Sequence, residues 1–189
     1  FTDVSIELGW VYVLFIVFWL VGFSNAVNLT DGLDGLAVGC VAIAAVAYAA
    51  ISYFVGSSTL SNYLLVSHIS GCGELTVMLG ALLGASLAFL WYNAPPARVF
   101  MGDVGSLALG GALGYVALVS RTELVLFVVG GVFVAETVSV IIQVISFKST
   151  GRRVFRCAPL HHHFEQKGWK ESTIVVRFWI IAVILGLAG

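Results

Sequence analysis

Long apolar runs separated by short polar stretches make up most of the chain. Each run is too long for a core strand and is close to the roughly 20 residues that a helix needs to cross a bilayer. The runs lie at about Leu8–Phe23, Leu36–Gly56, Leu75–Tyr92, Gly105–Ser120, Leu124–Phe147 and Thr173–Gly189. This pattern predicts an all-α, polytopic transmembrane helical bundle with about six spans.

The composition excludes an ordinary soluble domain. Hydrophobic residues make up 60% of the 189 residues and charged residues only 10%, whereas about a quarter of the residues are charged in soluble domains. The mean hydropathy is +1.04. No repeat or linker divides the sequence, so residues 1–189 are expected to form one integral membrane domain. Cys40, Cys72 and Cys157 lack the spacing of a disulfide framework or a zinc site.

Alternation through six spans places the loops 24–35, 93–104 and 148–172 on one face of the membrane. These loops carry most of the basic residues, namely Arg98, Lys148, Arg152, Arg153, Arg156, Lys167 and Lys170. Arg177 lies close to the last loop, and only Arg121 lies on the other face. Because cytoplasmic loops are enriched in Lys and Arg, the face with the three loops is predicted to be cytoplasmic.

The first of these loops contains the polar segment Asn28–Gly35. Asp31 and Asp34 are three residues apart, so they would share a face in a helical turn. The glycines of the segment let backbone amides approach a ligand closely. A simpler alternative is that Asp34 caps the span that begins near Leu36. Capping alone leaves Asn28 and Asp31 unexplained.

The second loop places Asp103 directly before the fourth span. A helix cap is again the simple alternative. The N-termini of the second and fourth spans would favour an anion such as a diphosphate, and Mg²⁺ commonly joins phosphate oxygens to one or two carboxylates. Phe100, in the same loop, would either anchor the loop at the membrane interface or offer a ring for stacking a nucleobase.

The third loop contains His161, His162 and His163 within a stretch rich in arginine. A charged cytoplasmic loop accounts for the arginines but not for three adjacent imidazoles. Consecutive side chains point in different directions, so at most two of the histidines should reach one ligand. Imidazole could bind a phosphate, accept a proton or ligate a metal.

Two polar side chains fall inside the predicted fifth span. A carboxylate is costly in hydrocarbon, so Glu136 should face the interior of the bundle. Gln143 lies seven residues further on the same helix face, which predicts a polar stripe facing other helices. We favour a structural, hydrogen-bonded role for Glu136 over a catalytic one.

Together, these segments resemble the phospho-N-acetylmuramoyl-pentapeptide transferases, within the superfamily of polyprenyl-phosphate N-acetylhexosamine-1-phosphate transferases. The resemblance runs through nearly the whole chain and is carried by Asn28–Ala37, Val99–Ser106, Gly131–Thr137 and Pro159–Trp169. Sibling transferases share the aspartate loops but usually differ at the triple histidine. The likeness is to the C-terminal part of the family, so the chain is expected to be a portion of a longer enzyme.

The resemblance implies a reaction and its partners. Phospho-MurNAc-pentapeptide would pass from UDP-MurNAc-pentapeptide to undecaprenyl phosphate, giving lipid I and UMP for peptidoglycan synthesis, with Mg²⁺ as cofactor. The setting would be the bacterial inner membrane, with the active site at its cytoplasmic face. The lipid bilayer is an expected partner, nucleic acid is not, and a homodimer is left open.

The resemblance also implies site residues. Asp103 corresponds to the metal ligand, and together with His161, His162 and His163 it would be catalytic. The nucleotide would bind at Asn28, Asp31, Asp34, Asn93 and Phe100. The family also has an adjacent Asp–Asp pair in an earlier loop, and this sequence contains none, so those carboxylates are expected to precede Phe1.

Three other functions compete with this one. A sibling transferase would use UDP-N-acetylglucosamine as its donor. A transporter or channel would line a cation path with carboxylates at mid-membrane, where this sequence offers only Glu136. A structural membrane protein would bind no nucleotide sugar.

Overall fold

The computed structural model describes residues 9–189, and within this range the chain forms helices and no strand. The helices are α1 (Val11–Thr30), α2 (Leu36–Gly56), α3 (Ser58–Leu64), α4 (Glu74–Asn93), α5 (Gly102–Val119), α6 (Glu123–Val129), α7 (Gly131–Thr150), α8 (Leu160–Glu165) and α9 (Glu171–Ala188). Six of them, α1, α2, α4, α5, α7 and α9, are long and apolar enough to cross a membrane. The predicted all-α fold with about six spans is confirmed.

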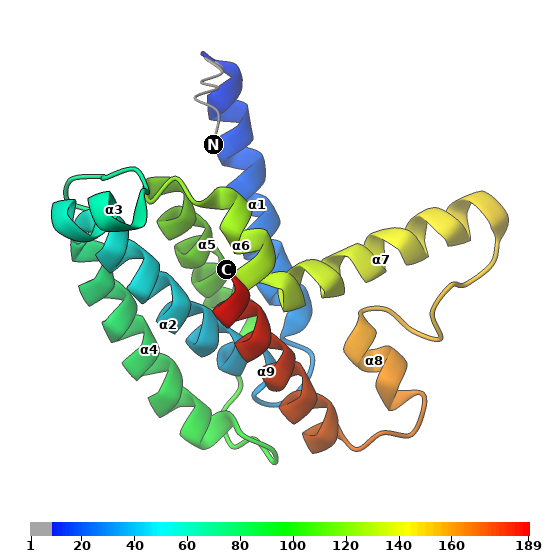
Figure 1. Cartoon of the computed structure of the whole chain (residues 1–189). Coiled ribbons are helices and arrows are strands. Elements are labelled where there is room, and N and C mark those ends of the chain that lie inside the picture. The colour runs from blue at the N-terminus through cyan, green and yellow to red at the C-terminus, as the bar shows by residue number, and fades with distance from the viewer. Residues whose placement is uncertain (1–8) are drawn as a thin grey trace.

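Helix α2 lies at the centre of the bundle and packs against α4, α5 and α9 (Figure 1). It is rich in alanine, and its residues Leu36, Ala37, Val41, Ala45 and Tyr48 are fully buried. Small side chains let helix backbones approach closely, which is how helices associate where lipid removes the hydrophobic drive between them. The composition of α2 therefore explains its central position.

Helices α1 and α5 form a second closely packed pair. A Cβ atom at Gly110 of α5 would lie 2.5 Å from the backbone oxygen of Phe23 on α1. The Trp19 indole donates a hydrogen bond to the Gly114 oxygen over 3.0 Å, and the Ser24 hydroxyl donates to the Leu107 oxygen over 2.8 Å. These contacts fix α1 relative to α5, and with them the ends that carry the polar segments.

The predicted first span ends too early. Its predicted start at Leu8 lies outside the described residues, and the helix continues past Phe23 to Thr30. The polar residues after Phe23 do not end the helix because the helix itself satisfies them: the Thr30 hydroxyl donates to the Ala26 oxygen, and the Asn25 amide donates to the Val21 oxygen. Asn28 therefore lies on α1 and not in a loop.

The prediction of one continuous fifth span is wrong. Helix α6 ends at Val129 and α7 begins at Gly131, with the break at Gly130. Two successive glycines weaken a helix, and the side chain of Leu185 on α9 packs against Gly131. After the break, α7 projects sideways out of the bundle (Figure 1). Helix α7 still contacts α1, α6, α8 and α9.

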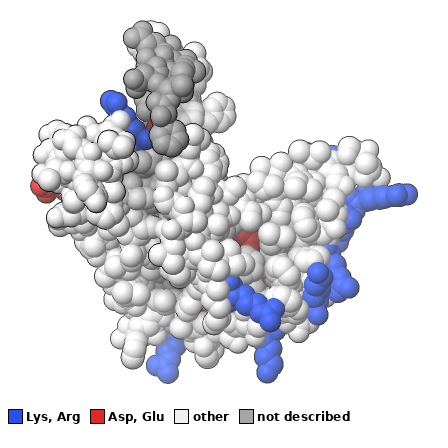
Figure 2. All heavy atoms as spheres, in the orientation of Figure 1, with Lys and Arg blue, Asp and Glu red and all other residues white. Residues whose placement is uncertain are grey.

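The three polar segments meet at one end of the bundle, as the alternation of spans predicts. The ends of α1 and α4 and the beginnings of α2, α5 and α9 all lie there, joined by hydrogen bonds that are described below. Figure 2 shows most Lys and Arg side chains along the lower and right-hand edges of the molecule, around a broad surface that is mostly uncharged. The charge distribution matches a bundle that spans the membrane and carries its basic loops on one side.

Candidate functional site

A pocket of about 300 Å³ opens at the end of the bundle where the polar segments meet. Its walls come from the end of α1 and the turn to α2, from the end of α4, and from the start of α5 with the loop before it. The lining residues are Asn28, Asp31, Gly32, Leu33, Asp34, Asn93, Phe100, Met101, Gly102 and Asp103. We call this the acidic pocket. It brings together all five predicted nucleotide-binding residues and the predicted metal ligand, whose roles stay predictions.

Asn28 connects α1 to α5 at the wall of the acidic pocket. Its side-chain amide donates hydrogen bonds to Asp103 Oδ1 over 3.0 Å and to Ser106 Oγ over 2.9 Å. Ser106 is buried and donates in turn to the Gly102 oxygen. Asn28 therefore orients the Asp103 carboxylate, whose second oxygen accepts no hydrogen bond from the described residues.

Two carboxylates, those of Asp31 and Asp103, lie near each other in this pocket. Partial burial and the nearby negative charge of Asp103 raise the pKa of Asp31 above its ordinary value. Within residues 9–189 no Lys or Arg forms an ion pair with either aspartate. The local field of the pocket thus favours a cation, which would relieve the repulsion between the two acids.

Asp34 holds the turn before α2 to the loop after α4. Its Oδ2 accepts a hydrogen bond from the Ala97 backbone N–H over 2.8 Å, and its own N–H donates to Glu171 Oε1 over 2.9 Å. The N-cap of α2 is Gly35, in the left-handed conformation with φ +78°, and no side chain caps the helix. The alternative that Asp34 is a helix cap is therefore wrong.

Asn93 has a similar connecting role. Its Oδ1 accepts from the Gly35 N–H over 3.0 Å, and its side-chain amide donates to the Val99 oxygen over 2.8 Å.

Asp103 lies in the first turn of α5, one residue beyond the helix start, and the N-cap is Met101. The capping alternative is thus wrong for Asp103 as well.

Phe100 is one of the exposed residues of the predicted site. Its side chain is 75% exposed at the rim of the acidic pocket. An exposed aromatic ring beside a polar pocket is available for stacking on a planar ligand.

The three adjacent histidines differ in burial and in hydrogen-bond partners, a difference that the sequence does not reveal. All three lie on the short helix α8, but only His161 is fully buried. His162 is partly exposed and its Nδ1 is hydrogen-bonded to Glu165 Oε2. His163 Nδ1 accepts from the Arg156 N–H over 3.1 Å, and its partial burial and the charges of Lys167 and Arg156 lower its pKa.

Glu136 faces the interior, as predicted, and contacts α8. It is fully buried on α7, and its carboxylate accepts hydrogen bonds from the N–H groups of Leu160 and His161. Its Oε1 also lies 3.2 Å from His161 Nδ1, although the angle is not that of a hydrogen bond. The predicted hydrogen-bonded, structural role of Glu136 is consistent with these contacts.

Gln143 does not form a polar stripe against other helices. Its Oε1 accepts from the N–H groups of Val154 and Phe155, and its Nε2 donates to the Phe155 oxygen. The prediction is wrong because α7 leaves the bundle after Gly130, so the face that carries Gln143 meets the following loop. Glu136 and Gln143 together attach the segment before and within α8 to α7.

Sequence reasoning missed two site residues. Glu171, at the start of α9, anchors the backbone of Asp34, and Ser106 supports Asn28. No spacing signal points to Glu171, because the contact joins positions 34 and 171. Ser106 belongs to the segment Val99–Ser106 that carries the family resemblance, and its position three residues after Asp103 was a usable signal.

The described residues contain no group of three or more His, Cys, Asp or Glu side chains placed to hold a metal ion together. A site for Mg²⁺ does not require one, because this ion usually keeps waters and takes one or two carboxylates with substrate phosphates. The oxygen-rich set of Asp31, Asp103 and Asn28 is compatible with such a site.

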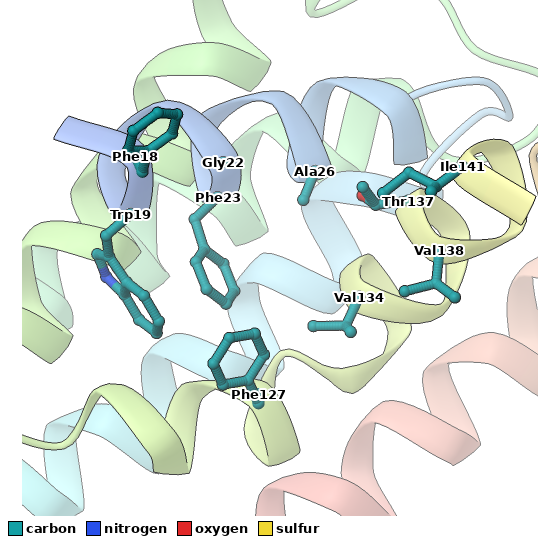
Figure 3. A pocket seen from close by; sticks show the side chains of 10 residues that line it. All are labelled: Phe18, Trp19, Gly22, Phe23, Ala26, Phe127, Val134, Thr137, Val138 and Ile141. Atoms are coloured by element: carbon teal, nitrogen blue, oxygen red, sulfur yellow. The ribbon is translucent and has the colours of Figure 1, made fainter. Parts of the chain in front are cut away.

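An apolar groove of about 250 Å³ lies between α1, α6 and α7 (Figure 3). Its lining residues are Phe18, Trp19, Gly22, Phe23, Ala26, Phe127, Val134, Thr137, Val138 and Ile141. The ring of Phe127 packs edge-on to Trp19, with centroids 5.3 Å apart, and beside Phe23. The Thr137 hydroxyl donates to the Phe133 oxygen, so the groove offers a hydrocarbon surface with little hydrogen-bonding capacity.

Known proteins resemble this chain over its whole length. It is 62% identical over 189 residues to the phospho-N-acetylmuramoyl-pentapeptide-transferase of Rhodopseudomonas palustris strain BisB18, covering 100% of this chain and 52% of the relative. The protein of the same name from strain BisA53 is 61% identical over 187 residues, with shares of 99% and 52%. The chain thus spans about half the length of these relatives. Residues 1–121 match the family described as glycosyl transferase family 4, and the chain belongs to that family.

Proposed function

We propose that the protein to which this chain belongs transfers phospho-MurNAc-pentapeptide from UDP-MurNAc-pentapeptide to undecaprenyl phosphate. Lipid I and UMP would be the products, and the enzyme would work at the cytoplasmic face of a bacterial inner membrane. The single observation that carries the proposal is the acidic pocket, in which residues from two segments far apart in the sequence, 28–34 and 93–103, line one cavity. The names of the two relatives support the choice of substrates.

The reaction exchanges one phosphoanhydride for another. An oxygen of the lipid phosphate forms a bond to the sugar-bearing phosphorus of the donor, and the bond from that phosphorus to the UMP oxygen breaks. Such a transfer needs little driving force, so the protein has chiefly to position two anions and offset their repulsion.

Mg²⁺ is the proposed cofactor, and Asp103 is its proposed ligand. When bound, the ion would neutralise phosphate charge and act as a Lewis acid. The raised pKa of Asp31 supports this role, because the two carboxylates lack a positive partner in the described residues. Asn28 would keep Asp103 in its orientation through the hydrogen bond between them.

The nucleotide is proposed to occupy the rest of the acidic pocket. Phe100 offers an exposed ring for the uracil. Asp34 and Asn93 shape the pocket by joining the turn before α2 to the loop after α4. Among the histidines, His162 is the candidate for contact with phosphate or for proton transfer, since it is accessible and paired with Glu165.

The apolar groove is the proposed place for the polyprenyl chain of the acceptor. It is lined by α1, whose last turn carries Asn28, and by α7, which carries Glu136. An isoprenoid chain requires an apolar surface of this kind and no hydrogen bonds. The groove therefore supports a lipid acceptor more than a soluble one.

A transporter is the less favoured alternative. A cation path requires accessible carboxylates within the membrane, and the buried carboxylate of Glu136 is already occupied by backbone N–H groups. A sibling transferase with UDP-N-acetylglucosamine remains the closest competitor, because the acidic pocket would serve either donor.

Assays of the full-length protein with both donors test the proposal. The purified enzyme receives undecaprenyl phosphate, Mg²⁺ and either UDP-MurNAc-pentapeptide or UDP-N-acetylglucosamine, and UMP release and lipid products are measured. We expect turnover with the peptide-bearing donor alone. Turnover with UDP-N-acetylglucosamine alone would support the sibling activity, and turnover with neither would contradict the proposal.

A further inference from the structure

Helix α8 has an unusual N-terminus, because its capping acceptor comes from another helix. The N-cap residue is Pro159, whose side chain has no hydrogen-bonding atom. Glu136, on α7, supplies the acceptor instead: its two carboxylate oxygens receive the N–H groups of Leu160 and His161, the first two residues of α8. Free N–H groups in the first turn of a helix require such acceptors when they are buried.

The Glu136 contact also determines where His161 lies. Both side chains are fully buried, and His161 Nδ1 is 3.2 Å from Glu136 Oε1. Neither ring nitrogen of His161 has a hydrogen-bond partner among the described residues. Packing and not hydrogen bonding therefore holds the imidazole ring in place, so its role lies in what the ring contacts.

The far edge of the His161 ring presses on the turn that carries the aspartates. A Cβ atom at Gly32 would overlap His161 Nε2 and lie 2.9 Å from Cε1. Gly32 lines the acidic pocket between Asp31 and Asp34. Glycine is needed at this position for space, and the ring of His161 forms a backing for the pocket wall.

We propose that Glu136 and His161 are positioning residues that set the shape of the acidic pocket. Glu136 fixes the first turn of α8, and this turn seats the His161 ring against Gly32, so that the Asp31–Asp34 turn keeps its place. His161 thus acts through the pocket wall, whereas His162 is the accessible histidine of the same helix. The inference rests on the proposed function for its choice of nucleotide.

The first test measures binding of UDP in the presence of Mg²⁺ by calorimetry, on the full-length protein. Gly32→Ala should weaken binding about tenfold, because the added methyl group displaces the turn or the ring. His161→Ala in the Gly32→Ala background removes the overlap, so the double variant should bind UDP at least about threefold more tightly than Gly32→Ala alone. Gly73→Ala, outside the acidic pocket and with no heavy atom within 4 Å of the new methyl group, is the matched control and should bind as the wild type does.

The rescue separates positioning from general destabilisation. A protein that is merely destabilised would not recover when a second buried side chain is removed. Unchanged binding in Gly32→Ala, or losses that simply add in the double variant, would overturn the inference. Absence of UDP binding by the wild type would instead contradict the proposed function.

The second test is independent of the nucleotide. Hydrogen exchange of the peptide that covers 160–165 is compared between the wild type, Glu136→Gln and the control Glu74→Gln, whose side chain is exposed. Glutamine replaces one acceptor oxygen by a donor NH₂ group, so the amides of Leu160 and His161 should exchange about tenfold faster. Exchange in Glu136→Gln equal to that in the wild type would show that Glu136 does not hold α8.

Discussion

Asp31 and Asp103 illustrate how single residues set the chemistry of this molecule. Each is a plain loop or helix-start carboxylate in the sequence, and only in the folded chain do partial burial and the nearby charge of Asp103 raise the pKa of Asp31. The Asn28 side chain donates hydrogen bonds to Asp103 and to Ser106, and these bonds orient the Asp103 carboxylate. Neither aspartate forms an ion pair with a Lys or Arg of the described residues. The two acids together therefore favour binding of a cation.

Asp103→Asn should have opposite effects on stability and activity. Removing the negative charge near Asp31 lowers the pKa of Asp31 and should raise the melting temperature in Mg²⁺-free buffer by about 1–2 °C. Transfer should fall more than about a hundredfold if Asp103 holds the metal. Thermal unfolding and UMP release measure the two effects, and near-normal turnover would remove the metal role.

His163 should be neutral at pH 7. Its partial burial and the charges of Lys167 and Arg156 lower its pKa below 6.5, so the unfolded chain binds the proton more readily than the folded protein. The contribution of His163 to stability is therefore present above about pH 6.5 and is lost as the pH falls. Histidine NMR titration should give a pKa below 6.5, rising in Lys167→Gln; a value at or above 6.5 in the wild type would contradict this.

Helices differ in how much of their geometry comes from their own sequence. Helix α2 is central because it is rich in small side chains, and this composition is visible in the sequence. The break at Gly130 is different. A glycine pair inside an apolar run is compatible with close packing or with a bend, and the contact of Gly131 with Leu185 of α9 joins positions far apart in the chain. The sequence therefore predicts the apolar segment but not its division into α6 and α7.

Neighbouring glycines of α5 offer a matched pair of substitutions. Gly110→Ala places a methyl group 2.5 Å from the Phe23 oxygen and should destabilise the protein by about 1–3 kcal/mol. Gly111→Ala meets no heavy atom within 4 Å and should leave stability unchanged or raise it by up to about 1 kcal/mol. Thermal unfolding in detergent compares the two variants, and equal effects would mean that the close approach of α1 and α5 does not limit stability.

At the scale of the whole molecule, helix α1 contributes residues both to the polar pocket and to the apolar groove. The acidic pocket includes Asn28 and Asp31 at the end of the helix, and the groove includes Phe18, Gly22 and Ala26 further back. Helix α7 lines one side of the groove with Val134, Thr137, Val138 and Ile141 (Figure 3). This arrangement suits a reaction between a water-soluble donor and a lipid acceptor.

Gly22→Leu tests the groove separately from the pocket. The position lines the groove, and a Cβ atom there meets nothing within 4 Å, so the larger side chain fills space without disturbing the helices. The KM for undecaprenyl phosphate should rise about fivefold while UDP binding stays unchanged. Gly84→Leu, on the exposed side of α4, is the control, and an equal KM in both variants would remove the acceptor role of the groove.

The sequence by itself determined the membrane-spanning class and the parity that gathers the polar segments at one end. Its motifs also singled out Asn28, Asp31, Asp34, Asn93, Phe100 and Asp103, which the structure places around one pocket. These properties follow from hydropathy and from motifs within short segments, which local composition encodes. Only the tertiary structure decided where α6 and α7 separate, that Asp34 holds a loop and caps no helix, and which histidine is buried against Glu136. Each of these depends on contacts between distant positions, whose free energy is set by packing and burial in the assembled bundle.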